Sequence, residues 1–149
     1  MKRTTFLHSI MILVLVAGTL ACGTSLVIED VDYSQPLESV LVPDANNQVH
    51  DQRYAIKLSI TPVLQEEGIS GVDEIRLIRN RAGFYFITAS RFSHVYVFEP
   101  DDGELKLKRK IEITGDGLGQ PAFNQRNTHI ELVDMASGRT YNIDQNGIR

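Results

Sequence analysis

Short strand-like segments separated by tight turns follow one another from Val72 to Ile113, and this regular succession constrains the fold more than any other feature. The four expected strands are Val72–Arg79, Phe84–Thr88, Val95–Phe98 and Leu105–Ile113. Runs that alternate between apolar and polar residues, or are apolar on both faces, are typical of β-strands. An Asp-Gly pair ending at Gly103 favours a tight hairpin between the last two. The segment therefore predicts an antiparallel four-stranded meander.

The side chains of these strands predict where each lies in the sheet. The two middle strands are apolar on both faces, as expected for strands that are covered on both sides. On the last strand, alternation would place four apolar residues on one face, namely Leu105, Leu107, Ile111 and Ile113. Lysines would occupy the opposite face and suit a sheet edge, because charge discourages the addition of another strand.

A second, shorter copy of this unit follows the first. A shift of 45 residues places Phe84–Ala89 on His129–Asp134 and Tyr96 on Tyr141, and one deletion then aligns Gly103 with Gly147. A period of about 45 residues in four-stranded units is typical of β-propeller blades. We therefore expect an all-β body of about one and a half antiparallel blades, with no room for an outer strand in the second. The expected units are blade 72–113 and partial blade 117–149.

The junction between the two units resembles a known family. Residues Tyr96–Gly103, a charged strand and then Gly115–Phe123 are similar to the blade junction of bacterial six-bladed β-propellers related to NHL repeats. The resemblance covers roughly residues 54–149 and lacks about four blades, which implies an N-terminal fragment. It implies architecture and a cell-envelope location. Because that family contains binding modules and some enzymes, it implies no single activity.

The N-terminus predicts export and a lipid anchor. A basic start, an apolar stretch from Phe6 and a small-residue exit are the parts of a secretory signal. Leu20-Ala21-Cys22 resembles the lipobox of bacterial lipoproteins, in which the cysteine is lipidated; ordinary cleavage with an incidental cysteine is the alternative. The expected organisation is a helical signal segment at 1–21, a lipid anchor and polar tether at 22–53, and the β body at 54–149.

The glycines of the body are interpreted as blade turns. Gly115, Gly117 and Gly119 are not spaced as in the Gly-x-Gly-x-x-Gly dinucleotide fingerprint, and no helix is expected after them. Together with Gly103 and Gly147 they are therefore predicted to be structural, and no cofactor is expected.

Three groups of polar residues are weighed as sites and interpreted as structural. The acidic cluster is expected to be a solvated turn rather than a calcium site; it comprises Glu99, Asp101, Asp102 and Glu104. The histidines lack zinc-ligand spacing; they are His50, His94 and His129. The basic stretch is expected to be a solvated edge; it comprises Lys106, Lys108, Arg109 and Lys110. No metal site and no catalytic group is predicted.

These features predict a non-enzymatic binding or scaffold module, lipid-anchored in the periplasm or outer membrane. A formal charge of −4 argues against nucleic acid as a partner. The alternatives are a fragment of a propeller lyase or lactonase and a small structural lipoprotein unrelated to propellers. One blade face would lack a cover, at Phe84, Phe86, Val95 and Val97. The chain could therefore be an N-terminal piece, could pair with a partner or second copy, or could fold Tyr54–Ile60 back over the meander.

Overall fold

The computed structural model describes residues 38–149, which form antiparallel β-sheets with one short helix. The first sheet has the order β1-β4-β5-β6-β7 and the second the order β11-β10-β9-β8, while β2 and β3 form a separate hairpin. The first sheet contains β1 (Ser39–Leu41), β4 (Ile75–Arg79), β5 (Tyr85–Thr88), β6 (His94–Asp101) and β7 (Glu104–Glu112). The second contains β8 (Pro121–Gln125), β9 (Ile130–Asp134), β10 (Arg139–Asp144) and β11 (Gly147–Ile148). The remaining elements are β2 (Gln48–Asp51), β3 (Ile56–Ser59) and helix α2 (Thr61–Glu67). The all-β prediction is confirmed.

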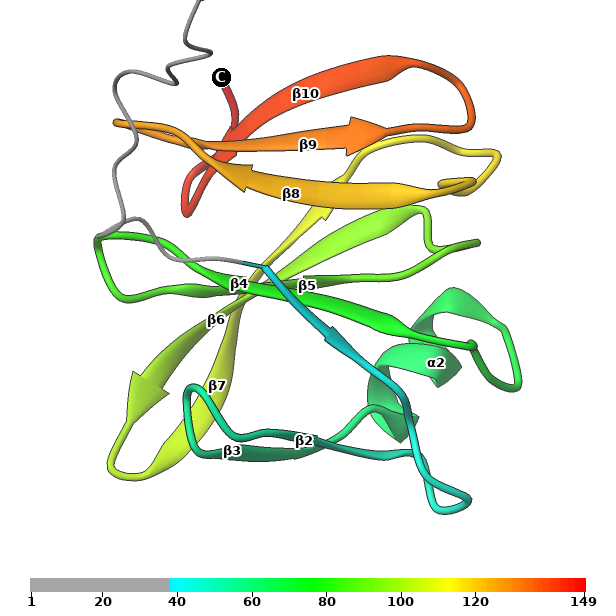
Figure 1. Cartoon of the computed structure of the whole chain (residues 1–149), viewed down its shortest axis with the longest axis vertical. Helices are drawn as coiled ribbons and strands as arrows, with labels where there is room; N and C mark the ends of the chain where they lie inside the picture. Colours follow the sequence, from blue (N-terminus) through cyan, green and yellow to red (C-terminus); the bar gives the residue numbers. More distant parts are fainter. Residues whose placement is uncertain (1–37) are drawn as a thin grey trace, which may run out of the picture. The chain divides into compact units, whose positions relative to one another are not determined.

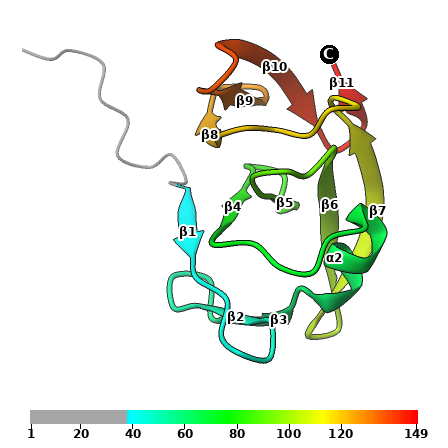
Figure 2. The same cartoon turned by 90° about the vertical axis from the view of Figure 1, so that its right-hand side faces the viewer.

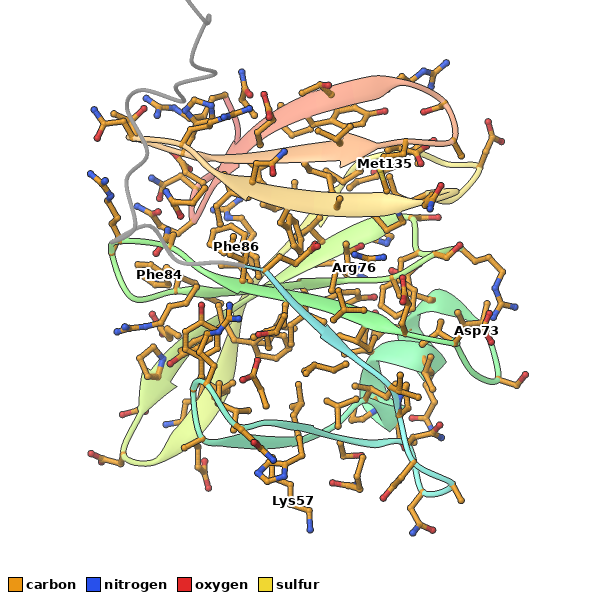
Figure 3. The ribbon with its side chains drawn as sticks, in the orientation of Figure 1. Lys57, Asp73, Arg76, Phe84, Phe86 and Met135 are labelled. Atoms are coloured by element: carbon orange, nitrogen blue, oxygen red, sulfur yellow. The ribbon has the colours of Figure 1, made fainter. Side chains whose placement is uncertain are left out.

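These elements stack in three layers (Figures 1 and 2). The second sheet covers one face of the first, and the β2–β3 hairpin and α2 cover the other. Two apolar cores result. One core lies between the two sheets and includes Phe86. In Figure 3, Phe86 and Arg76 extend from β5 and β4 toward β8. The other lies beneath the hairpin and helix and includes Leu77.

The expectation that one face of the first unit lacks a cover is wrong. Phe86, Val95 and Val97 have no exposed surface, and Phe84 is half-buried. Side chains of the second sheet, among them Ile130, pack against them in the same core. The argument for self-association through this face therefore loses its basis.

The fold-back alternative agrees with the structure. Strand β3 lies within Tyr54–Ile60 and pairs with β2. Tyr54 and Leu58 pack against the core beneath the first sheet, and Ile60 is fully buried there. This segment and α2 thus cover the face opposite the second sheet.

The 45-residue spacing is matched by the strands. β5 and β9 begin 45 residues apart, as do β6 and β10. The prediction that the second unit lacks an outer strand is wrong, because β11 pairs Gly147 with Asp144 and Ile148 with Ile143. The turn before Gly147 is tight enough to leave two residues for pairing.

The prediction of a tether is wrong for residues 38–53. β1 pairs with β4, so that Ser39 lies opposite Leu77, and β2 pairs with β3, so that Val49 lies opposite Leu58. These strands are too short to show a periodic pattern, and the partner of β1 is distant in sequence. Residues 22–37, the signal segment and Cys22 lie outside the described residues.

The single-face prediction for the last strand is also wrong. β7 lies at the sheet edge as expected, but its register against β6 shifts between Val97 and Phe98. A β-bulge of this kind adds a residue to one strand and disturbs the alternation of side chains. Leu105 therefore packs against the core beneath the helix, whereas Ile111 lies in the core between the sheets.

Candidate functional site

Helix α2 forms one wall of the candidate site, and its local sequence explains its ends. Pro62 stands in the first turn, where its missing N–H removes no intrahelical hydrogen bond. Gly68 ends the helix in the left-handed conformation, with φ of 68°. Val63 and Leu64 are buried, so this face of the helix packs against the first sheet.

A buried carboxylate fixes the end of α2 to β6. The side chain of Glu67 is 3% exposed and accepts three hydrogen bonds. The Ser93 N–H and the Tyr96 hydroxyl donate to it at 2.7 Å, and its Oε1 lies 2.9 Å from His94 Nδ1. Because a buried carboxylate is costly unless its oxygens are satisfied, these contacts determine how the helix sits on the sheet.

Tyr96 is a hydrogen-bond donor in this network. Burial raises the pKa of Tyr96 well above its usual value of 10.0, and the hydrogen bond to Glu67 raises it further. The hydroxyl therefore stays protonated. Its ring packs edge-to-face on Phe92, with centroids 6.0 Å apart.

A groove of about 450 Å³ runs between α2 and strands β6 and β7. Its apolar lining includes Val63 and Phe98, and Leu107, whose surface is 55% exposed. The volume is within the range of small-molecule sites, about 300–1,000 Å³. The groove thus offers apolar surface that is accessible from outside.

A charged pair stands at the rim of this groove. Lys110 Nζ lies 2.7 Å from Glu66 Oε2, and both side chains are well exposed. The hydrogen bond between them lowers the pKa of Glu66 and raises the pKa of Lys110. Because exposed pairs contribute little, about 0–1 kcal/mol, Lys110 can exchange Glu66 for another anion at low cost.

A second hollow, of about 490 Å³, lies between β3 and the tip of the β6–β7 hairpin. Tyr54 and Tyr85 line it and meet edge-to-face at 5.6 Å. Exposed turn residues such as Gly103 and Glu104 form much of its rim. The α2 groove combines an apolar wall with an adjustable charge, and it is the better candidate for a ligand.

The five glycines predicted as blade turns lie in or beside loops between strands, and their steric surroundings differ. Gly103 lies in the β6–β7 turn with a φ of 85°, whereas Gly147 begins β11 directly after a turn and has a φ of 133°. A Cβ at Gly117 would lie 2.9 Å from the Arg91 carbonyl oxygen, and one at Gly119 would lie 2.5 Å from a side-chain carbon. Gly115 has open space around it, so sterics alone do not require glycine there.

Two ion pairs join the acidic cluster to the basic stretch. Lys108 bonds Glu99 at 2.9 Å, and Lys106 bonds Asp101. These carboxylates are directed to lysines on the neighbouring strand. Among residues 38–149, no group of three or more metal-binding side chains is gathered at one point.

The predicted histidines lie in three separate environments. His50 is exposed on β2, and His129 is half-buried beside Thr128. His94 belongs to the Glu67 network, which the sequence did not indicate, since nothing in its spacing connects α2 with β6.

Two further carboxylates join distant segments, and sequence reasoning missed both. Glu38 lies 3.0 Å from Arg76 and accepts the Phe123 N–H at 2.7 Å, linking β4 to the edge strand β8. Burial raises the pKa of Glu38, although the Phe123 N–H and Arg76 oppose this. Because residues 22–53 were predicted to be a tether, no contact of Glu38 with β4 or β8 was expected.

Asp134 holds the junction between the two sheets. It is 6% exposed and accepts hydrogen bonds from the Gln120 N–H at 2.7 Å, the Gly119 N–H at 3.2 Å and the Ser137 hydroxyl at 2.6 Å. Burial disfavours its charge, but these bonds outweigh burial and hold the pKa of Asp134 below its usual range. The junction loop is thus anchored by a side chain from β9.

Comparison with known proteins identifies no relative: no family model, curated protein or solved structure matches the chain. Within residues 38–149, no helix has the length and apolar character needed to cross a membrane.

Proposed function

We propose that this chain is a lipoprotein of the bacterial cell envelope whose β body binds a small amphipathic anion in the α2 groove. The observation that carries the binding role is the combination of an accessible apolar wall with an exchangeable lysine at its rim. The role is non-enzymatic: the Glu67 network is occupied in positioning α2.

The anchor is proposed at Cys22. Several acyl chains on one residue would hold the body at the membrane, since each buried methylene contributes about 0.8 kcal/mol. Cells fed an alkyne-tagged fatty acid are expected to label the wild-type protein and not Cys22→Ser, while Ser25→Ala, a matched change nearby, keeps the label. Failure of the wild type to take up label would contradict the anchor.

The body is proposed to consist of two propeller-type blades. The support is the recurrence of a four-stranded antiparallel meander at an offset of 45 residues and the stacking of the two sheets face to face. In this arrangement the hairpin and α2 occupy the face on which a preceding blade would stack.

The ligand is proposed to carry an apolar body and one anionic group. The apolar part would pack on Phe98 and Leu107, and the anion would replace Glu66 on Lys110. Anilinonaphthalene sulfonate has this chemistry and reports binding by its fluorescence. We expect saturable binding at one site in the wild-type protein.

Two variants and one control test the location of that site. Leu107→Asp and Lys110→Glu are each expected to weaken binding of the probe by about tenfold, equivalent to about 1.4 kcal/mol. Ile148→Asp changes a residue that is equally exposed, at 55%, but lies on β11. Equal weakening by Leu107→Asp and Ile148→Asp, in proteins with unchanged circular dichroism, would refute the groove as the site.

A further inference from the structure

One row of side chains runs across the first sheet and is wholly covered by the second. Ile78 on β4 pairs with Phe86 on β5, and Phe86 pairs with Val97 on β6. All three are 0% exposed and lie in the core between the sheets. This row is therefore the stacking surface of the first unit.

The equivalent row of the second sheet has the opposite chemistry. Asn124 on β8 pairs with Glu131 on β9, and Glu131 pairs with Asn142 on β10. These residues alternate with inward-facing Phe123, Leu132 and Ile143, so they lie on the outer face of the sheet. At the neighbouring position, Val95 of the first unit corresponds to Thr140 of the second. The three apolar residues of the stacking row thus correspond to three polar residues in the second sheet.

The polar row is internally satisfied at the surface. Asn124 Nδ2 donates to Glu131 Oε2 at 3.2 Å, and Arg126 pairs with the same carboxylate. Asn124 and Asn142 are exposed, and the Glu131 side chain is 21% exposed. Covering this row with an apolar sheet would remove water from two amides and a carboxylate without offering new partners.

We infer that the second sheet is a terminal cap: its outer face closes the stack toward water and prevents a further sheet, or a second copy of this chain, from adding there. Stacked repeats need such polar outer faces at their ends to stay soluble. The inference concerns a different surface from the α2 groove and does not depend on ligand binding. Two outward residues of β8 and β9, Ala122 and Val133, pair with each other and are apolar, and both are half-buried.

The accessibility of the face can be measured in the full chain. Asn142→Cys is placed in the polar row, and Lys57→Cys is placed on the outer side of the β2–β3 hairpin, where Figure 3 shows Lys57 directed away from the body. A charged maleimide is expected to modify the two cysteines at rates within about threefold of each other, with wild type measuring the background from Cys22. Protection of Asn142→Cys by about tenfold or more would mean that another surface covers the row, and would overturn the inference.

Transplanting the first row onto the second provides the converse test. The triple variant Asn124→Ile, Glu131→Phe, Asn142→Val is expected to associate in a concentration-dependent way in sedimentation experiments, while the wild type does not. A folded triple variant that stays as dissociated as the wild type would overturn the inference. If the triple variant is unfolded by circular dichroism, the labelling rates decide.

Discussion

Removing the Phe86 side chain tests whether the second sheet covers the first. Phe86 is 0% exposed and lies in the core between the two sheets. Phe-to-Ala changes at such positions cost about 3–5 kcal/mol, because the transfer free energy is lost and a cavity remains. A domain of this size has a total stability of about 5–15 kcal/mol, so Phe86→Ala is expected to remove a large part of it.

Urea denaturation followed by circular dichroism measures this loss. With a denaturant dependence of about 1–3 kcal/mol per molar urea, a loss of about 3–5 kcal/mol is expected to lower the midpoint by about 1–5 M. Phe84→Ala is the matched control, because it removes the same side chain from the residue directly before β5. Phe84 is only half-buried, and Lys108 Nζ lies 5.2 Å from the centre of its ring. It is expected to cost clearly less than Phe86→Ala.

The size of the Phe86 effect decides between two structures. If the second sheet did not cover Phe86, the ring would stay partly hydrated and its removal would leave no enclosed cavity. A loss below about 1 kcal/mol, or one equal to that of Phe84→Ala, would refute the covered interface.

Three other changes follow from the same contacts. Gly119→Ala is expected to lower the melting temperature, because overpacking costs about 1–3 kcal/mol, whereas Gly115→Ala has space and is expected to be close to neutral in the same thermal scan. Glu67→Ala is expected to cost about 1–3 kcal/mol by leaving buried donors unsatisfied, while Glu66→Ala, at an exposed pair, costs about 0–1 kcal/mol; equal losses in urea would contradict the network. Since the folded pKa of Asp134 is below its unfolded value, its contribution is present above the unfolded pKa and is lost as pH falls through the folded pKa. The wild type is therefore expected to lose stability across that acidic window, and a flat difference between wild type and Asp134→Asn would refute this.

The succession of strands and their recurrence after 45 residues were predictable, because both depend on short stretches of neighbouring residues. A meander needs only short apolar runs and turn residues such as Gly103, and each strand pairs with its neighbour in sequence. β1 was missed because its partner β4 lies more than thirty residues further along, and because three residues show no period. The β7 face assignment failed at the bulge, where one extra residue breaks an otherwise regular alternation.

The candidate site was the least predictable part. Two pairs within the β6–β7 hairpin, Lys106 with Asp101 and Lys108 with Glu99, join residues that are close in sequence. Lys110 instead pairs with Glu66 of α2, a contact that the sequence did not indicate. The Glu67 network depends on the position of α2 relative to β6, which no spacing in the sequence specifies. Nothing in the sequence therefore indicated that His94 contacts the buried carboxylate of Glu67.

The body contains two stacked sheets, and its two outer faces are adapted to water in different ways. Without the hairpin and α2, the first sheet would expose an apolar face to water. At one end, the hairpin and α2 bury that face, with Glu67 fastening the helix to β6. At the other end, the row Asn124–Glu131–Asn142 makes the face polar. The hairpin and α2, which precede β4 in the chain, supply the first cover, and the α2 groove arises as a consequence of it.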